Sequence, residues 1–202
     1  MDHEGGGEKH EVGMSGPKKP KRSCVYWGML LLRFLALCAT VLATLIMSLN
    51  KESKTMVVAT IGTNPINATV TAKFQNTPAF VFFVIVNSIA SLYNLVMLLV
   101  DLFGYKFGFK GIKLLIMTVL DMGTVALVSA GTGAAASMAE LGKKGNSHAR
   151  WNKICDKFER YCDRGGGALI ASLVGICLLM ALNVMSTIAI HKNARAHQSI
   201  SN

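Results

Sequence analysis

The stretch LLLRFLALCATVLATLIMSL, residues 30–49, decides the fold because it is long and apolar enough to cross a membrane. At about 1.5 Å of rise per residue, a helix of this length spans a hydrocarbon core of roughly 30 Å. The apolar run begins at residue 25, and its single charged residue is Arg33. It lacks a small-residue cleavage site at its end, so we expect it to remain as a signal anchor.

Three further runs exceed the roughly 18 apolar residues that indicate a spanning helix, and they cover residues 79–100, 112–139 and 168–190. The chain of 202 residues is 51% hydrophobic, with a mean hydropathy of +0.42, which is too apolar for an ordinary soluble domain. The sequence therefore predicts an all-α membrane protein, a bundle of four transmembrane helices within residues 25–190.

The tails and loops carry most of the net charge of +10. Residues 1–24 form a polar tail that we expect to be disordered, and residues 191–202 form a second short polar tail. Basic residues beside membrane helices meet lipid headgroups, so membrane lipids and not nucleic acid are the expected partners.

An even number of spans places both termini on one side of the membrane. Basic residues are almost balanced between the two sides, but a dense cluster precedes the first span, formed by Lys18, Lys19, Lys21 and Arg22. Such a cluster favours a cytoplasmic N-terminus and hence cytoplasmic tails at both ends. The sequon Asn67-Ala68-Thr69 then lies in an outer loop, where Asn67 is a candidate glycosylation site.

The loop that carries this sequon has two β-prone stretches, residues 55–61 and 68–74. Between them, residues 62–65 read Gly-Thr-Asn-Pro, which is turn chemistry. A short extracellular β-hairpin is therefore expected in the first loop.

Charges inside two of the spans are the least expected feature of the chain. Arg33 interrupts the first span, and Asp121 interrupts the third in the stretch LLIMTVLDMGTVALVSAG, residues 114–131. A charge in hydrocarbon costs several kcal/mol, about 2.5–3.5 on insertion scales. At about 1.5 Å per residue, the two lie roughly 9 and 12 Å from the cytoplasmic edge. A bidentate pair between them is our prediction.

Other arrangements remain open for these two residues. Arg33 can extend to the cytoplasmic interface, while Asp121 is protonated or bonds to nearby Ser and Asn side chains. An ion or proton path is a further alternative, because polar residues also occur in the second and fourth spans, namely Asn87, Asn94 and Asn183.

The third span is rich in small residues spaced four apart. One row holds Ala126, Ala130 and Ala134, and another holds Ser129, Gly133 and Ser137. Such rows let helices approach closely, so they predict packing either within the bundle or between protomers. Alanines that face lipid generically are the alternative.

The last loop has an apolar helical stripe that predicts a short amphipathic helix over residues 151–162. Cys155 and Cys162 are a candidate disulfide if that loop meets an oxidising exterior. Seven residues of continuous helix would separate them by about 10.5 Å, beyond the roughly 7 Å limit for a disulfide. A bond between them therefore requires the segment to turn.

No recognisable catalytic or cofactor motif accompanies these features. Residues 131–136 formally match a G-x-G-x-x-A fingerprint, but they lie inside a span and not between a strand and a helix. We expect neither an enzyme nor a cofactor or metal.

Four motifs together resemble the Casparian strip membrane domain protein-like family of plants, tetraspan proteins related to the MARVEL group. They are Arg33 in the first span, Asp121 in the third, Phe-x-Asn-Thr-Pro-Ala-Phe at 74–80 and Trp-x-x-Ile-Cys-x-x-Phe-x-x-Tyr-Cys at 151–162. The loop cysteines of the family map onto Cys155 and Cys162. The first loop lacks the Glu-Ser-Leu-Pro-Phe-Phe-Thr-Gln-Phe stretch of true Casparian strip proteins, so the resemblance is to the "-like" branch, its first subfamily.

This resemblance implies a plasma-membrane scaffold that forms homo-oligomers and hetero-oligomers with family members and recruits cell-wall-modifying enzymes. Strip formation itself is not implied, because the characteristic loop is missing. A channel or transporter subunit that uses Arg33 and Asp121 is the alternative of a different class.

Overall fold

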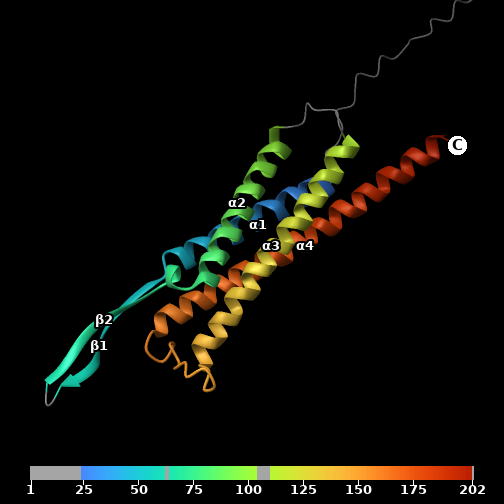
Figure 1. Ribbon diagram of the computed structural model, residues 1–202. Helices are drawn as coiled ribbons and strands as arrows, with labels where there is room; N and C mark the ends of the chain where they lie inside the picture. The colour runs from blue at the N-terminus through green and yellow to red at the C-terminus, as the bar shows by residue number, and fades with distance from the viewer. Residues whose placement is uncertain (1–23, 62–63, 104–109, 202) are drawn as a thin grey trace, which may run out of the picture.

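Four long helices and one β-hairpin make up the computed structural model, which describes residues 24–61, 64–103 and 110–201 (Figure 1). The helices are α1 (Cys24–Ser48), α2 (Pro78–Phe103), α3 (Lys110–Lys144) and α4 (Glu159–Ser201). Each contains a segment long and apolar enough to span a membrane. The predicted four-helix membrane bundle is confirmed.

Helices adjacent in the chain run in opposite directions, and α1 also packs against α4. The bundle is therefore a ring in the order α1, α2, α3, α4, with α1 and α3 on one diagonal. We call the end where α1 begins and α4 ends the terminal end, and the opposite end the hairpin end.

The hairpin consists of β1 (Lys51–Ile61) and β2 (Asn64–Lys73), paired antiparallel with an irregularity between Val57 and Ala59. Both strands begin earlier than predicted, and the hairpin projects away from the helices (Figure 1). Hydroxyl pairs link the strands, Ser53 to Thr71 at 2.8 Å and Thr55 to Thr69 at 3.2 Å. A short 3-10 turn, η1 (Phe74–Asn76), leads into α2.

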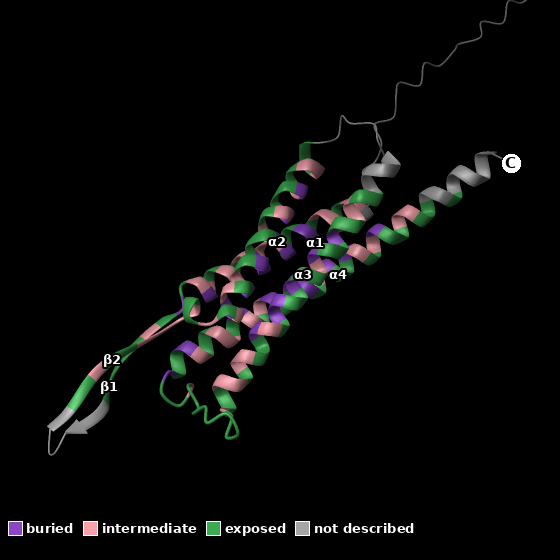
Figure 2. Cartoon of the chain, in the orientation of Figure 1, coloured by how far each residue is buried: buried purple, intermediate pink, exposed green. Residues whose placement is uncertain are grey.

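Many of the buried residues are small, while many large apolar side chains are exposed. Buried and exposed residues alternate along the helices (Figure 2). Ala36, Ala43 and Ala90 are fully buried, whereas Leu31 and Leu173 are more than half exposed. This distribution suits a lipid environment, because lipid tails are as apolar as leucine and close packing holds membrane helices together.

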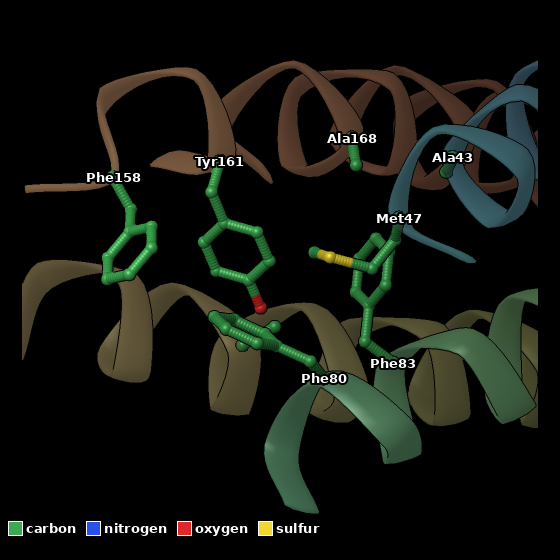
Figure 3. Close-up of a cluster of buried hydrophobic side chains, with 8 residues drawn as sticks. Ala43, Met47, Phe80, Phe83, Phe158, Tyr161 and Ala168 are labelled. Atoms are coloured by element: carbon green, nitrogen blue, oxygen red, sulfur yellow. The ribbon is translucent and has the colours of Figure 1, made fainter. Parts of the chain in front are cut away.

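The largest cluster of buried apolar side chains lies at the hairpin end of the core. There Met47, Phe80 and Phe83 meet Phe158 and Tyr161 of the α4 region (Figure 3). The rings of Phe80 and Tyr161 are 6.3 Å apart at an interplanar angle of 65°, an edge-to-face arrangement.

The two boundaries of the fourth helix differ most from the sequence prediction. The fourth helix begins at Glu159, whereas the predicted span begins at residue 168, because three consecutive glycines at 165–167 masked the helical pattern. The predicted C-terminal tail, residues 191–202, is helical through Ser201. The disorder predicted for residues 1–24 falls outside the described residues except for Cys24, which is the first residue of α1.

Candidate functional site: a buried ion pair and an exposed helix face

Arg33 and Asp121 lie together inside the bundle, 2% and 0% exposed. Arg33 Nη1 donates to Asp121 Oδ1 at 3.1 Å, and Nη2 donates to Oδ2 at 2.9 Å. This is the parallel two-bond geometry in which a guanidinium and a carboxylate match best. Neither the extended Arg33 nor the Asp121 bonded to Ser or Asn is the arrangement observed.

The pair joins helices that do not adjoin. Arg33 belongs to α1 and Asp121 to α3, which occupy one diagonal of the bundle. The long Arg33 side chain reaches across the bundle interior and connects α1 to α3. Breaking the pair would leave a buried charge uncompensated, which is strongly destabilising even where the intact pair adds little net stability.

Two further residues complete the cluster, and neither was predicted from the sequence. Tyr93 on α2 donates its hydroxyl to Asp121 Oδ1 at 2.7 Å, and its ring centre lies 5.9 Å from Arg33 Cζ. Asp101, near the end of α2, has Oδ2 at 3.5 Å from Arg33 Nε and a side chain that is 24% exposed. The sequence shows that Asp101 and Arg33 are charged, but not that they are neighbours. They meet because α2 runs antiparallel to α1, which places the end of α2 beside the start of α1.

A second polar layer crosses the bundle nearer the hairpin end. Thr132 on α3 and Ser172 on α4 share a hydrogen bond of 2.8 Å, and Ser172 donates to Asn87 Oδ1 on α2 at 3.0 Å.

The other asparagines of the spans lie outside this layer. Asn183 on α4 donates to Thr118 O and accepts from Met122 N of α3 once its amide is oriented to suit them. Asn94 donates to Ala90 O, while its own Oδ1 is buried without a partner. Asn87 and Asn183 therefore link neighbouring helices by hydrogen bonds, while Asn94 bonds within its own helix.

The small residues of α3 lie mostly on its outer surface. Five members of the predicted set are exposed, namely Ala126, Ser129, Ala130, Gly133 and Ser137, and Ala134 is half-buried. These five therefore do not pack inside the bundle, and packing between protomers or generic contact with lipid stays a prediction for them. The inward face of α3 uses another row instead, which includes Thr124, Val128, Gly131, Thr132 and Ala135.

Close helix approach inside the bundle relies on glycines outside the predicted rows. A Cβ at Gly131 would collide with the Val86 side chain on α2. A Cβ at Gly175 on α4 would lie 3.3 Å from Thr40 Cγ2 on α1. A Cβ at Gly133, by contrast, would meet nothing within 4 Å.

Cys155 and Cys162 form a disulfide in the structure, with their Cα atoms 5.7 Å apart. The predicted continuous helix over residues 151–162 is wrong, because α4 begins only at Glu159 and Cys155 lies in the preceding turn. The turn between the two cysteines that a bond required is present. The N–H groups of Ile154 and Cys155 also donate to Gly142 O, which ties this segment to the end of α3.

Asn67 is exposed on β2, opposite Val57. It lies six residues from the bundle end of the strand, roughly 20 Å at about 3.3 Å per residue. The sequon is therefore displayed well away from the helices.

Glu52 at the start of β1 joins the hairpin to α4 by accepting a 2.9 Å hydrogen bond from the Tyr161 N–H. Desolvation by itself would raise the pKa of Glu52. The bond from Tyr161 and the nearby Lys54 ammonium outweigh it, so that the pKa lies below its ordinary value.

Four spanning helices, an ion pair across one diagonal and a hairpin and a disulfide-closed segment at one end define a tetraspan membrane protein. The family model of the Casparian strip membrane protein domain matches residues 22–178, and the chain belongs to that family.

Curated relatives place the chain in subfamily 1B. It is 61% identical over 181 residues to CASP-like protein 1B2 of Populus trichocarpa, covering 90% of this chain and 89% of the relative. It is 56% identical over 182 residues to CASP-like protein 1B1 of Glycine max, covering 89% and 92%. CASP-like protein 1B1 of Arabidopsis thaliana is 53% identical over 155 residues, covering 77% and 79%. No solved structure matches the chain.

Proposed function

We propose that the protein is a non-enzymatic scaffold of the plasma membrane that self-associates laterally through the outer face of α3. Its neighbours in the assembly are further copies of itself and other members of its family. The hairpin end recruits partners that modify the cell wall.

The observation that carries this proposal is that α3 exposes only small side chains over part of its length. From Val128 to Met138, every exposed residue of α3 is Ala, Gly or Ser. Nearby stretches of the other helices expose large side chains, such as Leu45 on α1, Ile85 on α2 and Leu173 on α4. Membrane helices associate through small-residue faces because their backbones can approach closely there.

The test is a bulky substitution on this face, Gly133→Leu, with Ala181→Leu as the matched control. Gly133 has open space around it, so the variant should fold normally, and Ala181 is an exposed position on α4. We expect Gly133→Leu to reduce chemical crosslinking between differently tagged copies in plant cells. It should also raise lateral mobility after photobleaching of a fluorescent fusion.

Ala181→Leu should leave both measurements at their wild-type values. Equal crosslinking and mobility in all three proteins would contradict assembly through α3. Loss of assembly in both variants would place the interface elsewhere.

We place both termini in the cytoplasm and the hairpin end outside the cell. The basic cluster before α1 supports this orientation, as do the exposed sequon and the disulfide at one end of the bundle. Protein from plant membranes should lose mass on glycosidase treatment, and Asn67→Gln should already have the reduced mass. Glycan on the wild type that persists in Asn67→Gln would contradict the assignment of the site.

A channel or transporter subunit is the second candidate, and Asp101 favours it. Its partly exposed carboxylate links the buried Arg33 to the terminal end of the bundle. Ion or proton flux into liposomes that contain the purified protein, abolished by Asp121→Asn, would favour this candidate over the scaffold.

A further inference from the structure

A cavity of about 1220 Å³ lies at the hairpin end, between α3, α4 and the segment that connects them. Its apolar walls include Met47, Phe80, Leu141, Ile154 and Leu169. The spanning segment of α3 ends at Lys144 and that of α4 begins at Glu159. The cavity therefore lies where lipid headgroups meet acyl chains, and its volume is large enough to hold a small molecule.

Three consecutive glycines of α4, Gly165–Gly167, form part of the cavity wall. Glycine in a helix interior costs about 1 kcal/mol relative to alanine, so three in a row need a reason. Packing within the chain does not supply it, since a Cβ at Gly166 or Gly167 would meet nothing within 4 Å. Gly166 and Gly167 therefore leave open space beside the helix where other residues would place a side chain.

Two polar groups at the cavity have unused hydrogen-bonding capacity. Asn50 is 2% exposed, and its Nδ2 donates to Tyr161 O at 2.7 Å, but its Oδ1 is buried without a partner. The Tyr161 hydroxyl points across the bundle toward Phe80 (Figure 3) and makes none of the hydrogen bonds found among the described residues. Both residues line the cavity. A buried acceptor left unpaired costs free energy that a hydroxyl-bearing ligand would recover.

Charge at the cavity indicates which lipids it would reject. Among the lining residues two are basic, Lys143 and Arg150, and four are acidic, Glu140, Asp156, Glu159 and Asp163. All six are exposed, so they form a predominantly negative margin to an apolar interior. An anionic phosphate headgroup is disfavoured there, and an uncharged head is favoured.

We infer that this cavity binds a membrane sterol, with its ring system beside Gly166 and its hydroxyl bonded to Asn50 Oδ1. A sterol combines the required features, namely a rigid apolar body, one hydroxyl and no charge. The inference is independent of the scaffold role, because among the exposed small residues of α3 between Val128 and Met138 the cavity contains Ala136 but not Gly133.

The test uses the full-length protein in phosphatidylcholine vesicles that contain a photoactivatable sterol. After irradiation, the labelled peptides are mapped by mass spectrometry. Label should concentrate in the 136–143 and 159–170 segments, and an excess of unlabelled sterol should suppress it. Phosphatidic acid at the same excess should not.

Gly166→Leu is the decisive variant, since the new side chain would occupy the space in front of the glycine wall. We expect it to reduce labelling at least about tenfold, the effect of losing one well-buried contact of roughly 1.4 kcal/mol. Gly133→Leu is the matched control, because it makes the same change on an open helix face outside the cavity. It should label as the wild type does.

Label spread evenly over all four helices, or unaffected by Gly166→Leu, would overturn the inference. Equal competition by phosphatidic acid would also overturn it, since it would indicate an anion site. If Gly166→Leu abolishes crosslinking between copies while sterol labelling is absent, the cavity receives a second protein chain and not a sterol. The scaffold proposal fails on Gly133→Leu instead, so the two failures are distinguishable.

Discussion

The two ends of this bundle are closed in different ways. Toward the terminal end, charged and polar side chains converge on one point, where Arg33 meets Asp121, Tyr93 and Asp101 across the helices. At the hairpin end the helices enclose a cavity, and a disulfide and main-chain hydrogen bonds hold the segment that closes it. Specific polar contacts therefore hold the helices together at one end, while at the other end a cavity remains between them.

Removing one charge from the terminal cluster should have the largest effect on stability. Among the described residues, Asp121→Asn leaves the buried Arg33 guanidinium with Asp101 as its remaining charged partner, and we expect a loss of about 3–5 kcal/mol. The measurement is reversible unfolding of the purified protein by SDS in mixed micelles. The control is Asp156→Asn, an exposed carboxylate at the hairpin end, which should change stability by less than about 0.5 kcal/mol. Similar values for the two variants would remove the distinction between the ends.

Removing the disulfide should lower the free energy of unfolding by less than Asp121→Asn does. Cys162→Ser should lower the free energy of unfolding by about 2–3 kcal/mol, as expected for a short closed loop. Cys177→Ser removes an exposed free cysteine and should be nearly neutral. The bond itself is checked by mass spectrometry after alkylation without reductant. Labelling of Cys155 and Cys162 in protein from plant membranes would contradict the expected bond.

The same substitution should destabilise the protein on the inner face of α3 but not on its outer face. Gly131→Leu forces a side chain into Val86 and should destabilise the bundle by about 1–3 kcal/mol. Gly133→Leu meets no neighbour and should leave unfolding unchanged. Thermal unfolding of the two variants in one detergent makes the comparison. Equal destabilisation would mean that Gly133 also packs inside the bundle.

Much of this arrangement could be predicted from the sequence. Hydrophobic length located all four helices, turn chemistry located the hairpin, and the cost of an isolated charge in hydrocarbon pointed to Arg33 and Asp121 as partners. The start of α4 was missed because Gly165–Gly167 have little apolar character, although they continue the helix.

Periodicity alone could not choose which small residues of α3 face inward. Rows spaced four apart occur on both sides of the helix, and only the positions of α2 and α4 decide that Gly131 is buried and Gly133 exposed. The roles of Tyr93 and Asn50 likewise depend on neighbours distant in sequence, at Asp121 and Tyr161.

The smallest expected effect is a response to pH at the hairpin. The pKa of Glu52 is lowered in the folded state from an ordinary value of 4.5. Its contribution is therefore fully present above that value and is lost as the pH falls through the lower folded-state pKa. Protection of the Tyr161 amide from hydrogen exchange, corrected for intrinsic rates, should exceed that in Glu52→Gln at pH 6. The difference should vanish in acid, and a difference that persists there would contradict the assignment to the carboxylate.

The most direct test of the diagonal ion pair is a double-mutant cycle with Arg33→Met and Asp121→Leu. Apolar replacements are preferable to a charge swap, because an acidic residue at position 33 would lie close to Asp101. Each single variant should lose several kcal/mol in SDS unfolding, since each strands a buried charge. The double variant should lose less than the sum by about 2 kcal/mol or more. Strictly additive losses would show that the two residues are not energetically coupled and would contradict the account.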